Sequence, residues 1–95
     1  MFYEWEDTKE LENRRKHKIS LSAGISVFDD PYRLESYDDR FDYNEDRFIT
    51  IGKDSTLDIL YVCYTMRYEG HTTRLISVRR AEKHERRLYE KHKQW

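Results

Sequence analysis

The sequence predicts an α+β domain, because helical patterns near both ends of the chain flank a central region with strand periodicity. Two helix signals lie within residues 7–30, apolar residues alternate through much of residues 32–80, and good helix formers return from Ala81 onward. Short polar turns separate the later strands, which makes those neighbours antiparallel. We expect an N-terminal helical pair, an antiparallel sheet of about four strands and a C-terminal helix.

Length and composition favour one folded domain over residues 1–95. A chain of 95 residues has room for a single small core. Charged residues make up 39% and hydrophobic residues only 37%, a balance that approaches disordered chains, but the 15% aromatic content supplies large side chains to bury. No repeat, low-complexity tract or flexible linker indicates a domain boundary.

The first thirty residues predict a short strand and two helices. "FYEW" alternates as a strand does, and Asp7 followed by Glu10 resembles a capping box, so a helix is expected from about Thr8 to Lys16. Ser20 can cap a second short helix, "LSAGISVF", whose apolar residues recur at helical spacing. The "DDP" that follows ends it, because the residue before proline avoids helical geometry.

Four segments then predict the sheet. "YRLESYD" and "DRFITIGK" alternate, the latter with Ile49 and Ile51 on one face, while "LDILYVCYTMRY" is apolar on both faces and suits a central strand. The fourth is "TTRLISVR". The segments "GKDST" and "YEGHT" predict hairpin turns between the last three strands. Cys63, within the apolar run, is expected to be a core residue rather than a nucleophile.

The predicted last helix carries a thin apolar stripe of Ala81, Leu88 and Trp95. In the strand before it, alternation places Arg74, Ile76, Val78 and Arg80 on one face, and Leu75, Ser77 and Arg79 on the other. The row with Ile76 and Val78 is the better candidate for the core.

The near-zero net charge hides two opposed segments. Residues 29–46 contain eight acidic residues and two arginines, whereas residues 71–95 contain eight lysines or arginines and three glutamates. A second basic group lies within residues 9–18. A cationic segment at the junction of the last strand and helix predicts contact with phosphate groups, although a share of such cations is ordinarily solvated or in weak pairs.

Several familiar chemistries lack their motifs. The three glycines form no phosphate loop, and the four histidines lack zinc-ligand spacing, so we expect no cofactor and no metal. "DYNED" imitates a calcium loop, but Arg47 occupies the glycine position; a divalent cation in the acidic segment stays an alternative. No apolar segment is long enough for a signal peptide or a membrane span, so a cytoplasmic location without membrane contact is expected.

Three segments, in order, carry a resemblance to a known family. They are "WEDTKELENRRKH", "VFDDP" with "DDRFDYNEDRFITIG", and "RLISVRRAEKHERRLYE". The chain resembles the BrnT toxins of bacterial type II toxin-antitoxin systems. Glu6 stands where the family commonly has Asp, which keeps the carboxylate, and Lys18 stands where it has Gly, which removes a helix terminator.

The resemblance implies a RelE-like fold and a metal-independent ribonuclease that inhibits translation. It also implies a partner, a BrnA-like antitoxin whose ribbon-helix-helix part binds DNA, so that operator DNA is reached only through the antitoxin. RNA is the expected substrate.

The residues and the resemblance together give a candidate site. Arg79 is the expected phosphate clamp, assisted by Arg74, Arg47 and Arg86, because a guanidinium pairs with two phosphate oxygens and stays charged. Arg47 could equally be a cross-strand partner of Glu35 or Asp58.

The proton carriers are less defined by the sequence. Glu85 is expected to orient an arginine rather than act as a base, since nearby cations lower a carboxyl pKa. His17, next to Lys16, is the alternative proton carrier, although a lone histidine is more often structural. Further RNA-binding candidates are Lys16, Arg80, Arg86 and Tyr89; Tyr89 could stack on a base or pack in the core.

Two alternatives to an active ribonuclease remain at this point. One is a non-catalytic module that binds a protein or nucleic acid through the same basic surface. The other is a folded but inactive family member.

Overall fold

The structure, a computed structural model, describes residues 2–40 and 42–93 of the chain. These residues form five strands, two α-helices and one 3-10 helix, in the order β1 (Phe2–Glu4), α1 (Asp7–His17), η1 (Leu21–Asp29), β2 (Leu34–Tyr37), β3 (Phe48–Lys53), β4 (Ile59–Arg67), β5 (Thr72–Arg80) and α2 (Lys83–Lys93). The α+β class is confirmed. Within the described ranges, no helix is long and apolar enough to cross a bilayer.

The sheet has five strands in the order β1-β5-β4-β3-β2, one more than expected. The two hairpins predicted from turn signals join β3 to β4 and β4 to β5, and both pairs are antiparallel. The correction concerns β1, which the sequence predicted as a strand without placing it: it pairs in parallel with β5 through Phe2 and Thr72. The sheet is therefore mixed. Such a pairing has no turn signal, because its two strands are far apart in the chain.

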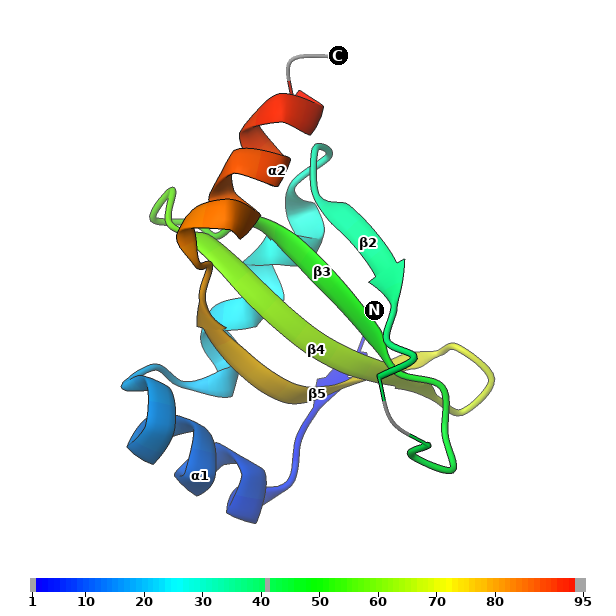
Figure 1. Ribbon diagram of the computed structural model, residues 1–95. Helices are drawn as coiled ribbons and strands as arrows, with labels where there is room; N and C mark the ends of the chain where they lie inside the picture. The colour runs from blue at the N-terminus through cyan, green and yellow to red at the C-terminus, as the bar shows by residue number, and fades with distance from the viewer. Residues whose placement is uncertain (1, 41, 94–95) are drawn as a thin grey trace.

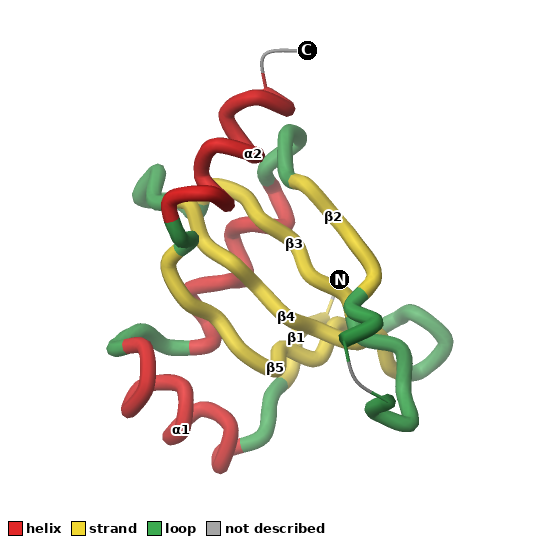
Figure 2. Tube along the Cα trace, viewed as in Figure 1, coloured by secondary structure: helices red, strands yellow, loops and turns green. Residues whose placement is uncertain are grey.

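The two faces of the sheet are covered differently, as Figures 1 and 2 show. The 3-10 helix η1 packs on one face and buries Leu21 and Val27 against Leu60, Val62 and other residues of β4 and β5. On the opposite face α2 covers only one end of β3 and β4, where Tyr89 packs with Ile49 and Ile51. Much of the second face is therefore left without a helix over it.

The first helix begins at Asp7 rather than after it, and the predicted capping box does not form. Glu6 occupies the N-cap position without a side-chain cap bond. The carboxylate of Glu10 instead accepts hydrogen bonds from the backbone N–H of Leu21, at 2.7 Å, and from Arg14, at 2.9 Å. Lys18 ends the helix in the left-handed region, φ 61°, doing what glycine usually does there.

Asn13 explains how so polar a helix is held in place. Its side chain is buried and pairs with both backbone groups of Val78: Nδ2 donates to the carbonyl at 2.8 Å, and Oδ1 accepts from the N–H at 2.9 Å. The side-chain amide of Asn13 thus takes the place of a neighbouring strand backbone at the edge of β5, beyond the end of β1. In Figure 1, α1 accordingly lies beside β5.

The expected alternation along β5 is wrong, because the strand contains an irregularity at Ile76. Tyr64 pairs with Leu75 and Cys63 with Ser77, so Ile76 is an extra residue opposite the β4 backbone. Leu75 and Val78, three residues apart, both enter the core beneath η1. The buried row is therefore Thr73, Leu75 and Val78, and not the row of Ile76 and Val78.

The apolar stripe expected on the last helix is also wrong. Leu88 is exposed, Ala81 precedes the helix, and Trp95 lies outside the described residues. The residues of α2 that are buried are instead Glu85 and Tyr89, four apart and therefore on one face.

Candidate active site

The open part of the sheet gathers the arginines that the sequence singled out. Residues opposite each other in a ladder share a face. Arg79 lies opposite Tyr61 and Arg74 opposite Thr65, and Tyr61 and Thr65 are four residues apart on β4, hence on the same side. The irregularity at Ile76 thus brings Arg74 and Arg79 to one face, whereas regular alternation would have separated them.

Arg79 is fixed from two directions. Its Nη1 and Nη2 donate to the two carboxylate oxygens of Glu85, each at 2.8 Å, and its Cζ lies 3.9 Å from the centre of the Tyr61 ring. Nη1 also donates to the carbonyl of Arg80 at 3.2 Å, and the exposed Glu82 lies 3.5 Å from Nη2. The guanidinium therefore has a defined position before any ligand binds.

Glu85 is a positioning residue in this arrangement. Its side chain is 8% exposed, and besides Arg79 it accepts the backbone N–H of Glu82 at 2.7 Å, which caps α2. Burial opposes ionisation, but the hydrogen bonds from Arg79 and Glu82 outweigh it and hold the pKa of Glu85 below its usual value. A carboxylate with a lowered pKa is a poor proton acceptor at neutral pH, which favours the orienting role.

His17 lies at the end of α1, within range of the charge on Arg79. Burial, together with the positive charges of Arg79 and Lys16, lowers the pKa of His17 below its usual value. The imidazole is therefore neutral around pH 7, the form that can accept a proton. Lys16 is exposed beside it. The pairing of Asn13 with β5 accounts for this neighbourhood, since it ties α1 to Val78.

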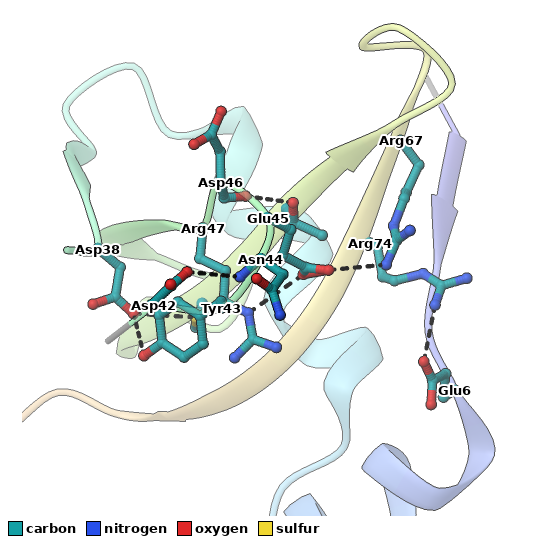
Figure 3. Close-up of polar contacts among 12 residues, drawn as sticks. Glu6, Asp38, Asp42, Tyr43, Asn44, Glu45, Asp46, Arg47, Arg67 and Arg74 are labelled. Atoms are coloured by element: carbon teal, nitrogen blue, oxygen red, sulfur yellow. Dashed lines mark hydrogen bonds and ion pairs between the residues drawn. The ribbon is translucent and has the colours of Figure 1, made fainter. Parts of the chain in front are cut away.

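Arg47 lies at the other end of the same face. Figure 3 shows the carboxylate of Glu45 between Arg47 and Arg67; it lies 3.4 Å from Nε of Arg47 and 3.2 Å from Nη2 of Arg67. The guanidinium of Arg47 also covers the ring of Tyr43, with Cζ 4.0 Å from the ring centre. Arg47 thus pairs with a carboxylate, as the alternative interpretation had it, but the partner is Glu45.

Arg74 is held by β1 and the residue that precedes α1. Its Nε donates to Glu4 at 2.8 Å and its Nη1 to Glu6 at 2.9 Å, while Nη2 makes a further contact with Glu4. Five residues separate Arg74 from Arg79, on the order of 15 Å of strand. Arg74 and Arg79 are therefore separate positions along one face, not two halves of one phosphate clamp.

Three other candidates do not join Arg79. Arg80 is exposed and lies opposite Leu60, so it points to the face covered by η1. Arg86 donates from Nη1 to the carbonyl of Ala81 at 2.7 Å and lies beside Ile59, Lys83 and Arg87. Tyr89 is 1% exposed and donates to Asp30 at 2.6 Å, which leaves no ring face free for a base. We therefore leave Tyr89 out of the proposed site.

Beyond β2, the acidic segment continues with Asp38 and Arg40, which lie against the open face beside Cys63 and Tyr61 of β4. Asp38, whose side chain is 0% exposed, accepts hydrogen bonds from Nε of Arg40 at 2.7 Å, from its Nη2 at 2.9 Å and from the hydroxyl of Tyr43 at 3.1 Å. These hydrogen bonds lower the pKa of Asp38 to about 2, with Arg40 as the main cause. Cys63 is buried below, and burial raises the pKa of its thiol, as expected for a core residue.

Sequence reasoning missed Tyr61 and Arg67, which lie on the open face beside the predicted arginines. Strand alternation could have placed them on a common side of β4. The contact of Tyr61 with Arg79 depends on strand register, and the pairing of Arg67 with Glu45, which Arg47 shares, depends on the conformation of a loop. No local sequence pattern reports either of them.

One group in the described part of the chain has side chains close enough to share a metal ion. Glu82, His84 and Glu85 each offer one ligand atom, and these atoms lie within 4.8 Å of one another. Both oxygens of Glu85 already accept hydrogen bonds from Arg79, so a metal ion would have to compete with that guanidinium.

Comparison with known proteins identifies the family. Residues 5–85 match the family described as the ribonuclease toxin BrnT of type II toxin-antitoxin systems. The fold is similar to the crystal structure of the Brucella abortus ribonuclease toxin BrnT, with a TM-score of 0.57 and 20% sequence identity over 87% of this chain and 100% of that one. No curated protein matches the chain. Since the family match covers most of its length, the chain belongs to the BrnT family of ribonuclease toxins of type II toxin-antitoxin systems.

Proposed function

We propose that this chain is an endoribonuclease that cleaves RNA by intramolecular transesterification, needs no metal ion, and thereby inhibits translation. In this reaction the ribose 2′-oxygen attacks the adjacent phosphorus and the bond to the 5′-oxygen breaks. The products are a 2′,3′-cyclic phosphate and a 5′-hydroxyl. A group must accept the 2′ proton, a cation must stabilise the phosphorane, and a donor must protonate the leaving oxygen.

The position of Arg79 is the observation that carries this proposal. A guanidinium already held by Glu85 and stacked on Tyr61 loses little freedom when it meets a developing negative charge. Its contact with the exposed Glu82, at 3.5 Å, is the one that a phosphate oxygen can replace at least cost. Arg74 and Arg47, farther along the face, would hold neighbouring phosphates of the strand.

His17 is the proposed general base. Its lowered pKa keeps the imidazole neutral near pH 7, and Arg79 is close enough to contribute to that shift. Lys16 would supply charge to the RNA backbone beside it. Glu85 acts through Arg79 and does not contact the substrate.

A second candidate function is a non-catalytic binding module, and one observation favours it. Arg79, Arg74 and Arg47 are each paired with carboxylates, so their charges are largely satisfied without a ligand. To bind phosphate, these arginines must exchange a carboxylate partner for a phosphate oxygen, which weakens phosphate binding. Such weak binding is sufficient for a binding module, which needs no catalytic group.

The family also bears on partners. A toxin of a type II system implies an antitoxin protein. We infer a BrnA-like antitoxin with a ribbon-helix-helix part, with operator DNA contacted only through it, and a complex located in the cytoplasm.

Replacement of Arg79 discriminates the two functions. In the ribonuclease, Arg79→Ala should lower kcat/KM for RNA cleavage about 100-fold or more and relieve growth arrest. Arg33→Gln is the matched control, because Arg33 also pairs with a carboxylate, Glu35 at 3.0 Å, but away from the site. The binding module instead predicts no cleavage by the wild type and a loss of affinity alone.

Two further measurements complete the experiment. Cleavage in EDTA, with the product ends identified as cyclic phosphate and 5′-hydroxyl, tests the metal-free reaction. Expression with and without the adjacent gene tests the antitoxin, since a cognate partner should restore growth. If purified protein leaves RNA intact and its expression is harmless, the ribonuclease proposal fails.

A further inference from the structure

The cations of the open sheet face and those of α2 differ in whether they have partners. The arginines of the open sheet face are paired with carboxylates. On α2, by contrast, the side chains of Lys83, Arg87 and Lys91 make no hydrogen bond or ion pair within the described residues. Their charges are therefore available to an external anion.

These cations lie on one side of α2. Lys83, Arg86, Arg87, Glu90 and Lys91 follow the spacing i, i+3, i+4, i+7 and i+8, which is a single helical face. Arg87 is four residues from both Lys83 and Lys91, and like charges at this spacing destabilise a helix. An arrangement that costs stability in the free protein favours a counter-charge supplied by a ligand.

The same residues line a cleft. Together with Ile59, the first residue of β4, they line a shallow depression, open to solvent, with a volume of about 560 Å³. Arg86 is oriented by its bond to the carbonyl of Ala81, and Glu90 is the one carboxylate among the lining residues. We call this the α2 cleft. It combines four cations with an apolar side chain, a composition suited to a strand of alternating phosphates and bases.

We propose that the α2 cleft binds the backbone of single-stranded RNA next to the cleavage site. This inference rests on the proposed function for its choice of RNA, and on charge complementarity for its choice of a polyanion. Arg79 lies at the end of β5, and Lys83 opens α2 only four residues later; the cleft is on the side of α2 opposite to Glu85. A strand whose scissile phosphate meets Arg79 can reach the cleft by passing the first turn of α2.

The test uses a fluorescent RNA with a 2′-O-methyl group on every ribose, which binds but lacks the attacking hydroxyl. Its Kd is measured by anisotropy over a range of salt concentrations. The variant carries Lys83→Gln, Arg87→Gln and Lys91→Gln; the control carries Lys9→Gln, Arg33→Gln and Lys53→Gln, which remove equal charge elsewhere. The cleft variant should lower the slope of log Kd against log salt by about 2, since each lost phosphate contact contributes about 0.7.

With cleavable RNA, the cleft variant should lower kcat/KM chiefly through KM, because it removes binding that is made equally in the ground and transition states. Its Tm should equal or exceed that of the wild type, since like-charge pairs are removed. These results, with little change in the control, support the cleft.

Equal weakening in both variants would overturn the proposal, because it would reveal only the loss of overall charge. So would unchanged RNA binding with lost capture of the antitoxin, which would assign the cleft to a protein. If the wild type binds the 2′-O-methyl RNA through the cleft but does not cleave unmodified RNA, the proposed ribonuclease function fails while the proposed binding site stands.

Discussion

The guanidinium of Arg79 lies over the ring of Tyr61, with 3.9 Å between Cζ and the ring centre, while Glu85 holds its two Nη atoms. Stacking constrains one direction and the bidentate pair constrains the plane, so the two contacts together define the orientation of the group. The arrangement resembles a prepared electrostatic site more than a surface ion pair, because Glu85 is nearly inaccessible.

Two replacements of Tyr61 should separate the contribution of its ring to RNA cleavage from that of its hydroxyl. Tyr61→Phe keeps the ring and should retain kcat/KM for RNA cleavage within about twofold. Tyr61→Leu removes the ring and should lower kcat/KM about fivefold, which corresponds to a cation–π contact of about 1 kcal/mol. Steady-state cleavage assays measure both. The positioning role requires the loss to fall on kcat; an equal loss in the two variants would assign it to the hydroxyl instead.

Glu85→Gln should affect stability and activity together. It removes the charge that neutralises Arg79 in a largely buried pair, and the free energy of unfolding should fall by about 1 to 3 kcal/mol. Urea denaturation measures the change. Glu82→Gln is the control, because Glu82 is 65% exposed and lies 3.5 Å from Arg79, so its effect should stay within about 0.5 kcal/mol. Equal effects of the two variants would contradict a special role for Glu85.

The fold was predictable where its signals are local. Turn residues placed both hairpins, and alternation placed Ile49 and Ile51 on one face, because each depends on neighbours in the chain. The parallel pairing of Phe2 with Thr72 was not predictable in this way. It joins segments without a shared turn, and three residues carry too little pattern to define a partner.

The candidate site shows the same limit at the level of single residues. The sequence predicted that Glu85 orients an arginine without indicating which one, and the structure pairs Glu85 with Arg79. It could not indicate Tyr61, because counting back from the turn without the extra residue Ile76 would set Tyr61 opposite Val78. One irregularity in the ladder thus decides which side chains meet.

Asn13→Ala should be strongly destabilising although α1 is a surface helix. The substitution leaves the N–H and the carbonyl of Val78 without their partners, at a cost of about 2 to 4 kcal/mol in the free energy of unfolding. Glu12→Ala, next to it and exposed, is the control and should change stability by less than about 0.5 kcal/mol. Hydrogen exchange at the Val78 amide should accelerate in Asn13→Ala; an unchanged exchange rate would argue against the edge pairing.

Asp38 should make the protein sensitive to acid. Its pKa is lowered to about 2 in the folded state, chiefly by hydrogen bonds from Arg40, so its contribution is present above about pH 4 and is lost as pH falls towards 2. The loss should be about 1 to 2 kcal/mol once the exposure of Arg40 is taken into account. Asp38→Asn should remove this part of the pH dependence, measured by urea denaturation at several pH values, and the exposed Asp39→Asn should not. Parallel curves for wild type and Asp38→Asn would contradict the assignment.

The pH dependence of cleavage tests His17. As a general base it must be neutral, so log kcat/KM should rise with pH below the His17 pKa and level off above it. The midpoint should lie below about 6.5, because burial and the charges of Arg79 and Lys16 favour the neutral imidazole.

Lys16→Gln removes one of those charges and should move the midpoint upward, while His17→Gln should abolish the rising limb and lower the plateau about 100-fold. The side chain of His84 is 70% exposed, so His84→Gln should leave the pH profile unchanged. The lowered pKa of His17 also makes folding less favourable as pH falls below about 6.5, because His17 binds a proton more readily in the unfolded chain than in the folded one. Cleavage rates must therefore be compared at pH values where each variant is fully folded. A rising limb that persists in His17→Gln would place the base on another residue.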